Sequence, residues 1–192
     1  METTNKETQY NMIVWLTIAI AILVSILLFS RLRFTAPPHF TIESAGDAFL
    51  DGHTRKDARV GKPVPAGMVV VTQGDALTMA YGDTRITLQP NVTMRVREVT
   101  DGRISLLATR GTFFVEPGTN SNVEVCTRRV CANATNPLMV EYVTPGEIAH
   151  IRPTALTHVV YNDRTQTIHE GDEFVVDELA QTVTLNGTVI EW

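Results

Sequence analysis

Apolar and polar residues alternate through much of the chain after residue 40, with a period of two that is typical of β-strands with one buried face. The clearest run is TRITLQPNVTMRVREV, which starts at Thr84. Its apolar positions fall on one parity: Ile86, Leu88, Val92, Met94 and Val96. We therefore expect these side chains to share one face of a sheet.

Turn signals separate the apolar runs. Asp101-Gly102 predicts a hairpin turn that accepts positive φ, after which Ile104 and Leu106 resume the alternation. Gly111 interrupts the pattern before TFFVEP, and Asn186-Gly187 predicts a second hairpin close to the end of the sequence. With Trp192 as the last residue, we expect the sequence to end inside a strand pair.

No segment after Phe40 has the period of a helix. Short strands separated by turns are typical of an all-β domain. We therefore predict an all-β fold, an antiparallel two-sheet sandwich or jelly-roll-like domain, preceded by one N-terminal transmembrane helix.

The segment from Met12 to Phe29 carries no charge, and only Thr17 and Ser25 in it are polar. Eighteen residues at about 1.5 Å each span about 27 Å, close to the thickness of a bilayer's hydrocarbon core. Since no good cleavage site follows, we expect a retained anchor rather than a signal peptide. The expected organisation is a short cytoplasmic tail (1–11), a transmembrane helix (12–30), a linker (31–40) and a β domain (41–192).

We place the N-terminal tail in the cytoplasm and the β domain outside. The charges that flank the segment favour the opposite orientation. Arg31 and Arg33 follow the segment, whereas Lys6 precedes it together with Glu2 and Glu7. By the positive-inside rule, the β domain would then be cytoplasmic, but the margin is only one or two charges and a large domain can cross regardless.

Composition bears mainly on what the domain does not do. The chain has 192 residues and a net charge of -5, so a basic field for nucleic acid is absent. The sequence contains no His-x-His, Gly-x-Ser-x-Gly, phosphate loop or dinucleotide fingerprint. Asp172 and Glu173 are adjacent and would point to opposite faces of a strand, and a metal site from His150 and His158 is disfavoured. We expect no enzyme activity, no metal and no cofactor.

The only two cysteines, Cys126 and Cys131, flank the polar stretch TRRV. If that stretch is a hairpin tip, the two residues are directly opposed, with Cβ atoms about 4.5–5.5 Å apart, and a small adjustment permits a disulfide. Two free thiols, or a metal pair completed by other residues, are the alternatives, although the spacing matches no common zinc pattern. A disulfide would favour an oxidising compartment.

Two arginines, Arg128 and Arg129, occupy the same tip. They could contact an acidic partner or a lipid head group. A solvated loop that keeps a β edge soluble is the simpler interpretation.

Two longer segments, VPAGMVVVTQGDALTMAYGDTRITLQPNVTMRV and GRISLLATRGTFFVEP, resemble the FecR-type domain. The resemblance extends roughly from Ile42 to Asp177 and closes on TIHEGDEFVV. Ala134 stands where the family pattern has a glycine. The matching positions are mainly the following strand and turn residues: Gly67, Thr72, Leu88, Arg103, Leu106, Gly111, Phe113 or Phe114, Val115, Thr135, Leu138 and Val140.

The resemblance implies an extracytoplasmic β domain on a single inner-membrane anchor. Well-known members of the family sense a signal outside the membrane and hold a sigma factor inside it. The ten residues METTNKETQY are too few for a helical unit that grips a sigma factor, so that activity is not carried over.

We therefore expect a non-catalytic cell-envelope module that binds a protein or glycan or senses a signal, with the membrane as its other partner. A lipid-transport bridge component of the LptC type and a structural subunit of a membrane assembly are the alternatives. The LptC type would need a continuous apolar groove between its sheets.

Overall fold

The computed structural model describes residues 12, 14–26, 37–52, 54–119, 121–144 and 146–190. The chain divides into two units between Pro37 and Pro38. In the first unit, residues 14–26 are helical. No helix among the described residues is both long enough and apolar enough to cross a membrane. The predicted span 12–30 includes residues 13 and 27–30, which lie outside the described residues, as do the predicted tail and Arg31 and Arg33.

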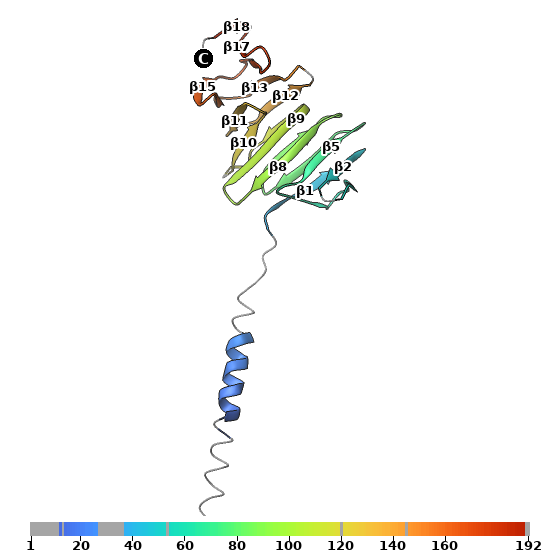
Figure 1. Ribbon diagram of the computed structural model, residues 1–192, viewed down its shortest axis with the longest axis vertical. Coiled ribbons are helices and arrows are strands. Elements are labelled where there is room, and N and C mark those ends of the chain that lie inside the picture. Colours follow the sequence, from blue (N-terminus) through green and yellow to red (C-terminus); the bar gives the residue numbers. More distant parts are fainter. Residues whose placement is uncertain are drawn as a thin grey trace, which may run out of the picture. The chain divides into compact units, whose positions relative to one another are not determined.

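The second unit is all-β, as predicted, and its strands pair mostly antiparallel (Figure 1). The pairings form two groups of strands, which we call sheet A and sheet B. Sheet A runs in the order β4 (Pro63–Pro65), β1 (His39–Ser44), β6 (Leu77–Tyr81), β7 (Thr84–Leu88), the second part of β9 (Arg103–Glu116), β12 (Leu138–Val143), β13 (Ile148–Pro153), β16 (Phe174–Asp177), β17 (Thr182–Leu185) and β18 (Thr188–Val189). Sheet B runs in the order β3 (Lys56–Asp57), β2 (Ala48–Asp51), β5 (Val69–Thr72), β8 (Thr93–Val99), the first part of β9, β10 (Asn122–Cys126), β11 (Val130–Ala134), β14 (Thr157–Tyr161) and β15 (Arg164–Ile168).

After β9 the chain alternates between the sheets one hairpin at a time. The hairpin β10–β11 lies in sheet B, β12–β13 in sheet A, β14–β15 in sheet B and β16–β17 in sheet A. The chain therefore crosses to the other sheet after the second strand of each hairpin. Both sheets are extended in turn along the sequence. One pair departs from the antiparallel prediction, because β10 runs parallel to β9.

The long strand β9 belongs to both sheets, and Gly111 is where it changes sheet. Residues before Gly111 pair with β8, and residues from Gly111 onward pair with β12. Gly111 has φ +92°, and a Cβ there would lie 2.7 Å from a methyl of Val92 and 2.9 Å from the carbonyl oxygen of Asn91. The expectation that Gly111 interrupts the strand pattern is thus refined: the strand continues, and glycine permits its bend.

The core draws side chains from both sheets, and this corrects the reading of the TRITLQPNVTMRVREV run. Ile86 and Leu88 lie in sheet A, whereas Met94 and Val96 lie in sheet B, and all four are 0% exposed. The five apolar positions do point into one core, but from two sheets. The turn at Asn91, whose φ is +62°, carries the chain from sheet A to sheet B. These five side chains remain on even-numbered positions on both sides of this turn.

Two predicted hairpins are present, with one difference. Asn186 and Gly187 have positive φ between β17 and β18, as expected of this turn. Asp101 and Gly102 also connect two paired strands, β8 and β9, but neither has positive φ. Trp192, predicted to end inside a strand pair, lies outside the described residues.

Candidate functional site

The tip of the β10–β11 hairpin carries both cysteines and both candidate arginines. Cys126 and Cys131 are directly opposed and joined by a disulfide with an S–S distance of 2.09 Å. The adjacent Thr127 donates its backbone N–H to the carbonyl of Val130 at 2.7 Å. Because hydrogen-bonded and non-hydrogen-bonded pairs alternate, the cysteines occupy a non-hydrogen-bonded pair, in which side chains approach most closely. The Cα atoms are 4.0 Å apart.

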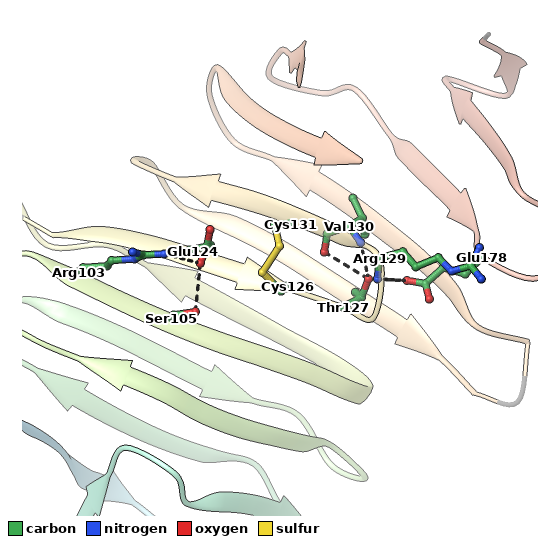
Figure 2. The surroundings of a disulfide bond; sticks show 9 residues. All are labelled: Arg103, Ser105, Glu124, Cys126, Thr127, Arg129, Val130, Cys131 and Glu178. Atoms are coloured by element: carbon green, nitrogen blue, oxygen red, sulfur yellow. Dashed lines mark hydrogen bonds and ion pairs between the residues drawn. A yellow bond between two sulfur atoms is a disulfide. The ribbon is translucent and has the colours of Figure 1, made fainter. Parts of the chain in front are cut away.

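A buried carboxylate holds this tip from behind. Glu178, only 1% exposed, accepts the hydroxyl of Thr127 at 2.6 Å and the backbone N–H of Arg129 at 3.2 Å. Figure 2 shows Glu178 beside the tip, on a different segment of the chain from the disulfide. Its other oxygen accepts the hydroxyl of Tyr142 at 3.2 Å. Three donors from two elements thus converge on one carboxylate that follows β16.

The buried environment and the neighbouring Glu178 favour the protonated phenol of Tyr142. Burial and, after it, the charge of the neighbouring Glu178 raise the pKa of Tyr142 to about 12. The phenol is therefore a permanent hydrogen-bond donor at ordinary pH. Tyr142 is also paired with Gly111 in the register of β12 and β9. It therefore lies opposite the bend of β9 and contacts the carboxylate of Glu178.

The two candidate contact arginines differ in what they touch. The guanidinium of Arg128 lies 3.0 Å from a carboxylate oxygen of Glu147, in the turn before β13. Arg129 contributes its backbone to Glu178, and within the described part of the chain its exposed side chain has no ion pair. Arg128 is thus tied to the domain itself, whereas the side chain of Arg129 is exposed.

A pocket of about 360 Å³ lies beside the tip. The residues around it come from both sheets and include Arg97, Leu107, Thr109, Arg128, Tyr142 and Glu147. Its wall therefore contains two guanidinium groups, one carboxylate and an apolar patch. This arrangement suits a small polar or charged group that reaches the tip from outside.

A second carboxylate, Glu124, lies two residues before Cys126 on the same face of β10. It accepts hydrogen bonds from Arg103 at 3.2 Å and from Ser105 at 3.1 Å (Figure 2). Glu124, Cys126 and Cys131 place their potential ligand atoms within 4.8 Å of one another. The disulfide occupies both sulfurs, so this set does not act as a thiolate metal site.

The remaining polar residues from the sequence are not brought together. His150 lies in sheet A, where its Nδ1 is 3.2 Å from Glu173, whereas His158 lies in sheet B beside Thr167. Hydrogen bonds from Arg152 and His150 hold the pKa of Glu173 below its usual range. Asp172 instead accepts the backbone N–H of His169 and the amide of Asn186, and these bonds lower its pKa. Both carboxylates thus have structural partners.

Sequence reasoning missed Glu178, Glu147 and Tyr142. Glu178 follows the apolar strand FVVD in a stretch whose polar residues resemble any strand end. Its burial depends on a hairpin tip 51 residues earlier in the chain. The pairing of β11 with β14 and of β13 with β16 brings Glu178 and the hairpin tip together. Such long-range pairing cannot be predicted from a local sequence pattern.

The fold has counterparts among solved structures, although no protein-family model and no curated protein matches the sequence. Two crystal structures described as a "putative anti-sigma factor" from Parabacteroides distasonis ATCC 8503, at 2.50 and 1.65 Å resolution, each superpose with a TM-score of 0.53. Each is 14% identical, and each match covers 62% of this chain and 58% of that one. At this identity the likeness concerns the fold alone, and this chain spans a little more than half of each of those chains.

Proposed function

We propose that the β domain is a non-catalytic sensing or binding module of a cell-envelope regulator, acting outside the inner membrane. Its fold likeness to crystal structures described as a putative anti-sigma factor carries the proposal. The FecR-type resemblance of the sequence points the same way. We further propose that the two sheets form a sandwich or jelly-roll-like body, and that the uncharged segment from Met12 to Phe29 anchors it.

The disulfide supports an extracytoplasmic position, because such bonds persist in oxidising compartments. The test is labelling of the two cysteines with a membrane-impermeant maleimide on intact cells, or on spheroplasts if an outer layer blocks it, with and without reductant. Labelling only after reduction is the expected result. Thiols that label only after the membrane is broken, without reductant, would place the domain in the cytoplasm, as Arg31 and Arg33 favour.

The binding surface we propose is the pocket beside the tip, together with the exposed Arg129, which follows the lining residue Arg128 in the chain. A photo-crosslinking residue at Thr109, in the pocket wall, should capture an envelope protein or glycan in living cells. The same residue at Thr184, in β17 of sheet A, is the matched control. Equal products from both positions, or none from Thr109, would argue against this surface.

The regulatory part needs a separate measurement. Removing residues 38–192 while keeping the N-terminal segment should change the transcripts of a defined set of promoters. The variant Arg129→Glu should shift the same set in part. A transcript profile that stays the same after removal of the whole domain would end the regulatory proposal, even if a partner binds.

The packing of the core weighs against a lipid-transport role. That role needs a continuous apolar groove between the sheets. The described apolar side chains of both sheets are instead packed together, and many, such as Phe113 and Val123, are 0% exposed. Photo-crosslinks from residues 86–96 to lipid would revive this alternative. A structural subunit would be recognised by stoichiometric partners that co-purify in mild detergent.

A further inference from the structure

The two sheets have four edge strands among the described residues, and three of them are poor templates for another strand. β3 and β18 are two residues long, and two of the three residues of β4 are proline. Proline lacks the N–H that an added strand would need, and short strands offer few groups to pair. β15, Arg164–Ile168, is five residues long and has no proline.

The register of β15 shows which of its backbone groups are free for a partner. β15 pairs with β14 through the turn Asn162-Asp163, so Tyr161 and Arg164 flank a two-residue turn as a hydrogen-bonded pair. Since the two kinds of pair alternate, Arg164, Gln166 and Ile168 direct their backbone groups toward β14. Thr165 and Thr167 therefore direct theirs away from the sheet. In agreement, the carbonyl of Thr167 accepts a bond from the side chain of Gln166 at 3.2 Å instead of from a strand.

We propose that β15 pairs with β15 of a second copy of this chain, antiparallel and in the register that places Thr165 opposite Thr167 of the other copy. The register is symmetric about Gln166, as a two-fold axis requires. Thr165 and Thr167 then exchange both backbone hydrogen bonds with their counterparts, twice in the dimer. Sheet B becomes continuous across the two copies.

The side chains are compatible with this register. On the outer face Thr165 and Thr167 oppose each other, a pair that is favourable across antiparallel strands. On the other face Arg164 opposes Ile168, so like charges do not meet. Beyond the strand, Asp163 of one copy approaches the end where His169 of the other lies. This self-complementarity is the reason to choose a second copy over an unrelated extended peptide.

The pairing needs little change in the free chain. Arg164 and Thr165 are exposed, and Gln166 and Thr167 are half-buried. Within the described residues β15 pairs only with β14. Among the described residues, the internal hydrogen bond to be exchanged is the one from the Gln166 amide to the Thr167 carbonyl.

Mixed-chain crosslinking of the full-length protein in membranes tests the register directly. A tagged chain with Thr165→Cys is mixed with an untagged chain with Thr167→Cys, both with the native Cys126–Cys131 disulfide intact. Under mild oxidation we expect a crosslinked heterodimer at several times the level of crosslinked dimer in either variant alone. The matched control mixes Thr188→Cys with Val189→Cys on the short edge strand β18.

A second substitution tests whether backbone pairing is responsible. Thr167→Pro, added to the tagged Thr165→Cys chain, removes an N–H that faces away from β14, so the hairpin should persist while the crosslink falls several-fold. Far-ultraviolet circular dichroism checks that the chain is folded. A mixed crosslink no stronger than the β18 control would overturn the proposal, as would a crosslink unaffected by Thr167→Pro in a folded chain. Both readouts are independent of the sensing function proposed above.

Discussion

Two neighbouring hairpins of sheet B turn in different ways. The β14–β15 hairpin closes with two residues, Asn162 and Asp163, at φ +47° and +62°. The β10–β11 hairpin closes with a disulfide and is held by Glu178, which lies about fifty residues further along the chain. The first turn follows from local backbone preference, whereas the second depends on the finished fold. Perturbations at the second tip should therefore act on the whole domain, and those at the first should stay local.

The largest effect is expected from Glu178→Ala. The substitution removes the acceptor of the buried hydroxyls of Thr127 and Tyr142 and of the partly buried N–H of Arg129. Each unsatisfied buried group costs about 1–3 kcal/mol, so we expect a loss of about 3 kcal/mol or more. Thermal unfolding of the full chain, followed by circular dichroism, measures it. Glu178→Gln keeps an acceptor and should lose less; equal losses would deny the hydrogen bonds this role.

Removal of the disulfide comes next. For a loop of six residues, the chain-entropy relation gives about 2 kcal/mol. Cys126→Ser with Cys131→Ser should therefore lower the free energy of unfolding by about that amount and leave the β content unchanged. Denaturant titration measures the difference. Glu178→Ala combined with the double serine variant should lose less than the sum of the two losses, because both act on one tip.

The local turn should respond more weakly. Asn162→Ala places a Cβ-bearing residue of poorer left-handed preference at φ +47°, and we expect a loss of about 1 kcal/mol. Asn162→Gly should be neutral or slightly stabilising, since glycine accepts positive φ. The same denaturant titration compares them. If Asn162→Gly were as damaging as Asn162→Ala, side-chain contacts rather than backbone would set this turn.

A pH dependence of stability at high pH is expected from the same disulfide tip. The pKa of Tyr142 is raised from 10 to about 12, so the folded state binds its proton more tightly than the unfolded state. Its contribution to stability is complete below pH 10 and is lost as pH rises through 12. Ultraviolet absorbance should show one tyrosine that ionises late and that is absent in Tyr142→Phe. Glu178→Gln should bring its pKa down; an unchanged late step would assign the shift to burial alone.

The sequence predicted the features that depend on residues close in the chain, and it missed those that depend on the finished fold. The turn at Asn186-Gly187 and the opposition of Cys126 and Cys131 depend on residues close in the chain, and both predictions are confirmed. The core positions were also readable, because alternation survives even when the chain changes sheet. The assignment of Ile86 and Met94 to one sheet was wrong for that same reason: parity reports inward or outward, and it does not report which sheet.

Only part of the candidate site could be predicted from the sequence. A pair of cysteines around a polar tip is a local signal, and it located the hairpin. Glu178 and Glu147 are ordinary acidic residues in the sequence, and only long-range strand pairing makes the first a buried acceptor and the second a partner of Arg128. The parallel pair β9–β10 was missed too, since it needs a connection that crosses back after Gly118 rather than a tight turn.

The double membership of β9 bears on the order in which the domain can assemble during synthesis. β7 and β8 are made before β9, and β10 and β12 after it, and all four pair with it. A nascent chain that ends before residue 103 therefore holds two groups of strands with no strand in common. Once Glu116 has emerged, each group gains its shared neighbour, and every later hairpin adds to a sheet that already exists. These fourteen residues are thus the strand that links the two earlier groups of strands to each other and to the hairpins that follow.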